Sequence, residues 1–295
     1  MAVVGATASG KSALALDLAE RLGGEIVNTD SMQLYRGMDI GTAKLPLAER
    51  RGITHHLMDV LEVTEPATVA EFQGRARAVV EDCRARGVTP VLVGGSALYT
   101  RAVLDSFEFP GTDAGVRARL EQELSQEGSV ALHARLAALD PEAASRVLSS
   151  NGRRVVRALE VVEITGRPFS ATLPEQRYHA EGTVQIGVDV DRPTLDRRIE
   201  DRVQQMWELG LVEEVRGLVA RGLREGRTAP RALGYSQVLA FLDGTCTEAD
   251  AQERTVTGTR RFARRQESWY RADSRIRWVA HDAPDRVDLA LAALS

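Results

Sequence analysis

Short runs of apolar residues alternate with amphipathic stretches along the first hundred residues. The runs at 2–4, 25–30 and 89–96 are each typical of a strand. The segment 13–22, between the first two runs, is rich in alanine and leucine and ends at Gly23-Gly24, which predicts a helix with a glycine stop. Strand, helix and strand make a βαβ unit, so we expect an α/β fold with a parallel sheet and right-handed crossovers.

A further short strand is predicted at 55–60, and a helix at 72–87 whose many charges are typical of a solvated face. The strand begins with His55 and His56. Neighbouring side chains point to opposite sides of a strand, so we interpret the pair as structural, or as a polar lining at most, and not as a joint metal site.

The pattern changes between residues 113 and 172, where helical periodicity dominates and no strand pattern interrupts it. The predicted helices are 116–126, 130–139, 141–148 and 153–165. We therefore expect an all-helical insertion at 113–182 between two parts of one catalytic core, 1–112 and 183–295.

The last third returns to the sheet pattern and then becomes rich in basic helices. Strands are predicted at 183–191 and 275–279, and helices at 195–210, 211–222 and 255–270, with another helix after the segment 232–237.

Composition narrows the class of protein. The chain has 295 residues, 43% hydrophobic and 27% charged, with a net charge of −4, which is ordinary for a globular protein and argues against a surface coated in basic charge. Two distant cysteines predict neither a zinc site nor a disulfide framework and fit a reducing cytoplasm. No apolar run is long enough to cross a membrane.

The first strand is short and begins almost at the first residue, which leaves no room for a signal peptide. Either the fold tolerates so short a strand, or the start has been set a few residues late.

Residues 4–12, V-G-A-T-A-S-G-K-S, contain the chemistry that organises the chain. They match G-x-x-x-x-G-K-[ST] with Gly5, Gly10, Lys11 and Ser12 in register. Glycines let backbone N–H groups approach a diphosphate, the lysine brings positive charge to the phosphates, and the serine hydroxyl is a Mg²⁺ ligand. The following helix directs the positive end of its dipole at the same anion.

Two other strand ends supply polar groups. Asp30 follows the second strand, and Gly94-Gly95 followed by Ser96 ends the strand at 89–96. Ligands bind beyond the carboxyl ends of parallel strands, so these groups should share an edge with the phosphate loop. Ser96 is either a donor there or the N-cap of a helix. The segment 31–44 is either a functional loop or a solvated connection.

Arginine clusters mark three helices. Arg153, Arg154 and Arg157 are spaced to share a helix face, and Arg198 and Arg202, four apart, are placed to close over phosphates. The third helix has two arginine pairs four residues apart, which predict one positive stripe suited to a phosphate backbone. Aromatic side chains are interleaved with the arginines; the residues are Arg260, Arg261, Arg264 and Arg265, with Phe262, Trp269 and Tyr270.

Taken together, the motifs resemble the tRNA dimethylallyltransferases. The resemblance rests on residues 5–12, on the long run D-S-M-Q-L-Y-R-G-M-D-I-G-T-A-K at 30–44, on 92–99, 154–160, 233–235 and 260–269. These segments occur in family order and cover nearly the whole chain. Position 6 is alanine where the family often has proline, and position 96 is serine where threonine is common. There is no Cys/His tail like that of the eukaryotic relatives, so the chain resembles the bacterial form.

The resemblance implies a P-loop kinase-like parallel sheet with flanking helices, and a Mg²⁺-dependent transfer of a dimethylallyl group. The donor would be dimethylallyl diphosphate, and the acceptor N6 of adenosine 37 in the anticodon stem-loop of a tRNA. We expect a cytoplasmic monomer that has no membrane partner. The catalytic residues would be Asp30 as the base, Ser96 and Lys11.

Two sets of binding residues follow. The expected diphosphate site combines the loop with two arginines: Gly5, Ala6, Thr7, Ala8, Ser9, Gly10, Lys11, Ser12, Arg198 and Arg202, with Ser12 also the metal ligand. The expected tRNA contacts are Asp30, Ser31, Met32, Gln33, Ser96, Arg117, Arg153, Arg154, Arg157, Gly234, Tyr235, Gln237, Arg260, Arg261 and Arg264.

Three other functions are weighed against this one. A small-molecule or nucleoside kinase would use ATP on the same loop but leaves the arginine clusters unexplained. A prenyltransferase acting on free AMP or ADP leaves the helical insertion unexplained. The third is a non-catalytic RNA-binding or nucleotide-switch protein. A switch would show an apolar strand ending in a metal-binding aspartate, and no convincing one is present.

Overall fold

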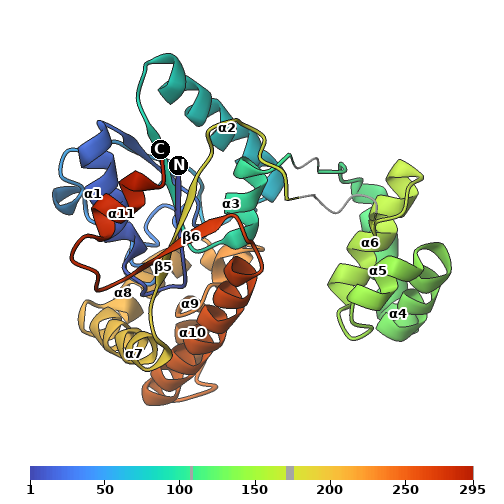
Figure 1. Ribbon diagram of the computed structural model, residues 1–295. Helices are drawn as coiled ribbons and strands as arrows, with labels where there is room; N and C mark the ends of the chain where they lie inside the picture. Colours follow the sequence, from blue (N-terminus) through green and yellow to red (C-terminus); the bar gives the residue numbers. More distant parts are fainter. Residues whose placement is uncertain (107–108, 171–175, 295) are drawn as a thin grey trace. The chain divides into compact units, whose positions relative to one another are not determined.

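The computed structural model describes residues 1–106, 109–170 and 176–294. It divides the chain into two compact units, which are described separately. The first unit combines Met1–Leu104 with Ala180–Ser295, and the second is Asp105–His179. Figure 1 shows the elements of both units, with the helices and the strands β5 and β6 labelled.

A parallel sheet forms the centre of the first unit. Its described strands lie in the order β3-β2-β4-β1-β5-β6, and every neighbouring pair is parallel. All three residues of β1 are buried because this strand lies inside the sheet, between β4 and β5. The strands are β1 (Ala2–Val4), β2 (Glu25–Asn28), β3 (His55–His56), β4 (Pro90–Val93), β5 (Gln185–Asp189) and β6 (Ile276–Ala280).

Helices cover both faces of this sheet, as the βαβ pattern requires. Figure 1 shows α1 and α11 on one side of the strands and α2 and α3 on the other. Helix α1 contributes Leu14 and Leu18 to the main apolar core, beside Ile26 of β2 and Ile186 of β5. These helices are α1 (Lys11–Leu22), α2 (Val69–Ala85), α3 (Ala97–Leu104) and α11 (Arg286–Ala292).

A second group of helices gathers at the carboxyl ends of the strands (Figure 1). Helix α10 packs against α7, α9 and α3. The group comprises α7 (Arg192–Glu208), α8 (Leu211–Ala220), α9 (Tyr235–Leu242) and α10 (Glu248–Arg271). Short 3₁₀ turns complete the connections at η1 (Leu47–Glu49), η3 (Leu223–Glu225) and η4 (Ala229–Arg231).

The second unit consists of helices with a core of their own. It contains α4 (Ala114–Leu139), α5 (Pro141–Arg146) and α6 (Gly152–Thr165), packed around leucines that include Leu120, Leu136 and Leu159. The helical geometry of α4 is interrupted at Gly128, where φ is +82°. The sequence predicted two helices there, 116–126 and 130–139, and Gly128 lies between them.

The helical unit begins before residue 113 and ends before residue 182, the limits expected from the sequence. Its two ends are joined by an antiparallel bridge between Asp105 and Tyr178, and the Ser106 N–H donates to the Arg177 carbonyl at 2.8 Å. Because the two connecting segments bond to each other, they belong to the helical unit. Residues 171–175 of the expected insertion lie outside the described residues.

Some elements differ from the sequence prediction. The strand expected at 55–60 ends at His56 because Leu57 and Asp59 adopt left-handed backbone angles, with φ of +60° and +57°. Helix α10 begins at Glu248, before the predicted 255, where Thr247 and Asp250 form a capping box. Within the described residues, no helix combines the length and the apolar character needed to cross a membrane.

Candidate active site

The phosphate-binding loop joins β1 to α1 and has the backbone geometry that its glycines permit. Gly10 precedes the helix with φ of +92°, and Gly5 has φ of +150°. Helix α1 begins at Lys11, two residues before the predicted start. The Ser9 hydroxyl is buried and has no hydrogen-bond partner among the described residues. A buried, unpaired hydroxyl inside an anion-binding loop is free to donate to a phosphate oxygen.

Lys11 lies at the first turn of α1, and its amine donates to the Ala6 carbonyl at 3.2 Å. Burial of this amine and the nearby Arg202 guanidinium lower the pKa of Lys11 to about 8, and Asp30 partly opposes the shift. Two cations held together in a desolvated site favour the binding of an anion. The loop therefore has the electrostatics of a diphosphate site before any ligand is bound.

Arg202 belongs to α7, and its Nη1 lies 3.5 Å from the Thr7 hydroxyl. Burial and the neighbouring Arg198 lower the pKa of Arg202. Helix α7 thus brings arginine charge to the phosphate loop, and Arg202 makes the direct contact. Arg198 is half-buried and close enough to Arg202 to influence it.

The turn after β2 fixes Asp30. The Asn28 side chain accepts the Asp30 N–H at 2.9 Å and donates to the Asp30 carbonyl at 3.1 Å. One carboxylate oxygen of Asp30 accepts the Met32 N–H at 2.9 Å. No basic side chain of the described residues forms an ion pair with Asp30, and the carboxylate keeps an oxygen for a ligand. It is therefore free to accept a proton or a hydrogen bond from a substrate.

Ser96, in the loop between β4 and α3, bonds to the Asp30 turn. Its Oγ lies 3.2 Å from both the backbone nitrogen and the hydroxyl of Ser31. Gly94 makes this approach possible, because a Cβ there would lie 2.4 Å from the carbonyl carbon of Thr29. The predicted meeting of the two strand ends is confirmed.

Several of these groups line one cavity of about 630 Å³, with Thr7 as the member from the phosphate loop. This volume suits a small organic ligand. Its polar wall includes Thr7, Asp30, Ser31 and Ser96, and its apolar wall comes from α3, α7 and α10 with the segment before α9: Leu98, Val203, Met206, Leu233, Phe262 and Trp269. A site with phosphate chemistry next to such an apolar wall can hold a diphosphate ester of a hydrocarbon chain.

Ser12 fits the chemistry of a magnesium ligand. It lies in the first turn of α1, its side chain is exposed, and its hydroxyl has no bonded partner among the described residues. Magnesium takes oxygen ligands, and it usually keeps waters and substrate phosphates beside only one or two protein ligands. One free hydroxyl beside a phosphate loop meets that requirement.

Helix α10 supplies a residue that sequence reasoning missed. Gln266 is buried, donates to the Gly95 carbonyl at 2.6 Å and accepts the Thr7 N–H at 2.9 Å. It lies within the aromatic and basic run of α10, but no local pattern separates it from the other polar positions.

The single arginine stripe predicted on α10 is divided in the structure. Arg260 pairs with Glu200 at 2.7 Å and donates to the Asp196 carbonyl, so it links α10 to α7. Arg261 and Arg264 are exposed. Arg265 lies over the Phe262 ring, 5.8 Å from its centre, where cation–π attraction holds it.

The segment at the start of α9 also has internal contacts. The Gly234 N–H donates to the Gln237 side chain at 2.9 Å, as a helix cap. Tyr235 is fully buried. The neighbouring Arg231, Ala232 and Leu233 line the cavity instead. Gly234, Tyr235 and Gln237, expected as tRNA contacts, are not among the residues that line the cavity. The expected Met32 also lines the cavity, and Gln33 donates to the Thr42 carbonyl at 3.1 Å.

The arginines of the helical unit fall into two kinds. Arg117 and Arg157 both pair with Glu160, whose side chain is completely buried. Arg153 and Arg154 are exposed, and neither side chain has a bonded partner among the described residues. The three arginines of α6 thus do not share one role: two are free to bind an anion, and Arg157 neutralises a buried carboxylate.

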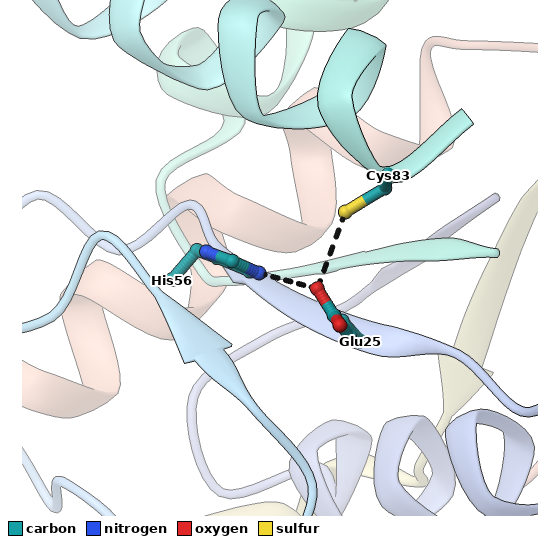
Figure 2. A group of neighbouring side chains, drawn as sticks. All are labelled: Glu25, His56 and Cys83. Atoms are coloured by element: carbon teal, nitrogen blue, oxygen red, sulfur yellow. Dashed lines mark hydrogen bonds and ion pairs between the residues drawn. The ribbon is translucent and has the colours of Figure 1, made fainter. Parts of the chain in front are cut away.

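A separate polar cluster lies between β2, β3 and α2, and none of its members lines the cavity. Figure 2 shows Glu25 between His56, at 2.7 Å, and Cys83, at 3.5 Å. Arg86 forms two bonds to the same carboxylate at 2.9 and 2.7 Å and lowers the pKa of Glu25 to about 2, with help from His56. Because a guanidinium already occupies this space, the cluster is a structural ion pair and not a metal centre. The structural interpretation of His56 agrees with this arrangement.

Comparisons with known proteins agree with this geometry. A sequence model described as IPP transferase matches residues 33–273. The chain belongs to the IPP transferase family. A tRNA dimethylallyltransferase of Nocardioides sp. strain ATCC BAA-499 / JS614 is 65% identical to it, over 100% of this chain and 95% of that protein. The corresponding protein of Thermobifida fusca is 62% identical, over 99% of this chain and 93% of its own length.

Solved structures of the family share the fold. The tRNA isopentenylpyrophosphate transferase of Bacillus halodurans matches with a TM-score of 0.73 and 37% identity, over 99% of this chain and 95% of that chain. A eukaryotic dimethylallyltransferase acting on tRNA matches with a TM-score of 0.83 and 26% identity, over 99% of this chain and 76% of its own. The predicted P-loop kinase-like parallel sheet and the resemblance to this family are confirmed.

Proposed function

We propose that this family member transfers a dimethylallyl group from dimethylallyl diphosphate to N6 of adenosine 37 in tRNA and releases diphosphate. One observation carries the proposal: a single cavity joins Thr7 of the phosphate loop, Asp30 and an apolar wall. The diphosphate of the donor, its short hydrocarbon chain and the acceptor amine would all meet there. The names of the close relatives agree with this chemistry.

The phosphate loop stabilises the leaving group. When the allylic C–O bond breaks, its electron pair remains on the diphosphate. Backbone N–H groups of the loop, with the buried amine of Lys11 and the nearby guanidinium of Arg202, would stabilise this charge. Ser12 would hold a magnesium ion, which would supply further positive charge to the same diphosphate.

Asp30 and Ser96 prepare the acceptor. The lone pair of an exocyclic adenine amine is delocalised into the ring, so the amine is a weak nucleophile. A carboxylate that accepts a hydrogen bond from N6 orients the amine and removes its proton as the C–N bond forms. The Asn28 contacts hold Asp30 for this role, and Ser96 lies beside the same turn. The adenine must leave its stack to enter the cavity.

Exposed arginines bind the tRNA backbone in this proposal. Arg153 and Arg154 present two free charges on the helical unit, and Arg261 and Arg264 present two on α10. Contacts to phosphates give affinity that depends on salt but not on base sequence. The helical unit is accordingly assigned to tRNA binding, and the cavity to the chemistry.

The test is direct. The protein is incubated with labelled dimethylallyl diphosphate, unmodified tRNA and Mg²⁺, and a parallel reaction replaces the diphosphate with ATP and a nucleoside. Label in the tRNA, lost when the metal is chelated, supports the proposal. Consumption of ATP with no label in tRNA would replace it with a kinase. In a third reaction AMP or ADP replaces the tRNA, and transfer to it at an equal rate would show that a free nucleotide is sufficient as the acceptor.

A further inference from the structure

The Glu214 carboxylate accepts four hydrogen bonds. One oxygen accepts the backbone N–H groups of Asp39 at 3.0 Å and Ile40 at 2.7 Å. The other accepts the Gly41 N–H at 3.3 Å and the Tyr235 hydroxyl at 2.5 Å. Three successive N–H groups that converge on one anion form an anion-binding nest. No basic side chain of the described residues forms an ion pair with Glu214, so its charge is balanced by this backbone segment.

The segment bound by Glu214 continues directly into the cavity wall. Gly41, Thr42 and Ala43 line the cavity that holds Asp30. A Cβ on Gly41 would lie 2.5 Å from the Tyr235 ring, so the backbone rests directly on that ring. The carboxylate and the ring therefore fix the wall from behind, by four polar bonds and by close packing.

A second charged group holds the other end of the same segment. The side chain of Lys44 is 3% exposed, and its amine donates to the Tyr35 carbonyl at 2.9 Å. It also donates to the carboxylates of Asp39 and Asp59, both at 2.6 Å. The wall is thus anchored at both ends by groups of opposite charge. The described cavity lining contains neither Glu214 nor Lys44.

A solvated loop is ordinarily held by fewer bonds to buried charged groups. The chemistry of the cavity gives a reason for holding this wall in place. The allylic carbon becomes electron-poor as its C–O bond breaks. In transfer, the N6 lone pair forms the C–N bond, and the N6 proton goes to the carboxylate base. In hydrolysis, the same C–O bond breaks, a water oxygen bonds to the carbon, the water proton goes to solvent, and an allylic alcohol is the product. A closed wall excludes that water.

We propose that Glu214 is a positioning residue that keeps the 41–43 wall closed, and so directs the allylic carbon to the amine rather than to water. It acts through the backbone of 39–41 and through Tyr235. The inference rests on the proposed function, since it concerns how the allylic group is divided between two acceptors.

The experiment measures both products of one reaction. Labelled dimethylallyl diphosphate is incubated with unmodified tRNA and Mg²⁺, and label is counted in tRNA and in the allylic alcohol. For Glu214→Gln we expect the ratio of alcohol to modified tRNA to rise by about 10-fold or more, because an amide in place of the carboxylate turns a donor toward the backbone N–H groups. The matched control is Glu213→Gln, whose carboxylate pairs with the exposed Arg216 at 2.8 Å. It should leave the ratio unchanged.

Gly41→Ala disturbs the wall while the carboxylate of Glu214 is kept. The added methyl group meets the Tyr235 ring and must displace the wall, so the ratio should rise here as well. A purely structural role would reduce the folded fraction and lower both products together. An unchanged ratio in Glu214→Gln and in Gly41→Ala would overturn the inference.

The wild-type reaction separates the two hypotheses. If the wild type labels tRNA and both variants keep its product ratio, only the role of Glu214 is lost. If the wild type labels neither tRNA nor alcohol, the proposed function itself fails, and the inference fails with it.

Discussion

The side-chain oxygen of Gln266 accepts the backbone N–H of Thr7 at 2.9 Å, although 259 positions separate the two residues. The side-chain nitrogen of Gln266 donates to the Gly95 carbonyl at 2.6 Å. One amide thus fastens helix α10 to the phosphate loop and to the loop that carries Ser96. Three segments that are distant in sequence share one buried polar link.

Replacement of Gln266 by leucine should damage both stability and diphosphate binding. Leucine has a similar size but leaves the Thr7 N–H and the Gly95 carbonyl without their partner, and an unpaired buried polar group costs about 1–3 kcal/mol. We expect a lower midpoint of urea unfolding and a higher KM for dimethylallyl diphosphate.

The control for this variant is Gln204→Leu. Gln204 is exposed on α7 and donates to Glu208 at 2.9 Å, so its loss should leave both measurements near their wild-type values. Equal unfolding midpoints for Gln266→Leu and Gln204→Leu would show that the buried link contributes nothing to stability.

Lys11 should impose opposite pH dependences on activity and on stability. Its pKa in the folded protein is about 8, below its ordinary 10.5, so the folded state binds fewer protons than the unfolded state between these values. Stability of the ligand-free protein should therefore rise as the pH rises through this window. The charge that attracts diphosphate is lost over the same range.

We expect kcat/KM for dimethylallyl diphosphate to fall above about pH 8, because this ratio reports the free enzyme. The corresponding fall in kcat should occur at a higher pH, since a bound diphosphate favours the charged form of the lysine. Lys11→Met, which cannot titrate, should lose the rise in melting temperature between pH 8 and 10. A rise of the same size in that variant would contradict the assignment to Lys11.

The arginines of α6 should separate into binding and structural residues. Arg153→Ala and Arg154→Ala together should weaken tRNA binding and reduce its salt dependence, because each free guanidinium that contacts a phosphate releases a counterion. Thermal stability should stay close to the wild type, as both side chains are exposed.

Arg157→Ala should behave differently. It leaves the fully buried Glu160 with Arg117 as its remaining arginine and removes the bonds from Arg157 to the Pro110 and Gly111 carbonyls. The buried carboxylate keeps only one of its two guanidinium partners, so the helical unit should unfold at a lower temperature. Filter binding at several salt concentrations and calorimetry distinguish the two classes. A double variant with an unchanged salt slope would show that Arg153 and Arg154 do not meet the tRNA.

The parts of the site that the sequence predicted are local ones. The phosphate loop is a contiguous pattern, and Asp30 and Ser96 each follow a recognisable strand. Parallel strands place their carboxyl ends at one edge, so the meeting of these residues follows from the fold class alone. The helical insertion was predictable for a similar reason, since periodicity marks each helix separately.

Contacts between distant segments were not predictable in this way. Gln266, Glu160 and Glu214 stand in helices at positions where a polar residue is ordinary, and only the packing of helices shows what each one binds. The arginine stripe on α10 was divided because α7 supplies Glu200 to Arg260. Helical spacing predicts the side of the helix on which an arginine lies. It does not predict which acidic residue of another element pairs with that arginine.

Asp30 offers the most direct test of the chemistry. Asp30→Asn keeps an oxygen to accept the Met32 N–H, which lies 2.9 Å from the carboxylate, so the turn after β2 should keep its shape. The amide cannot take a proton from N6. We expect transfer to fall by about 10²-fold or more while tRNA binding is kept, because a positioned base contributes this much to a rate. Asp30→Ala should lose as much transfer and also some stability. Near-normal turnover in Asp30→Asn, measured with the same labelled diphosphate, would remove Asp30 as the base and leave it a role in shaping the turn.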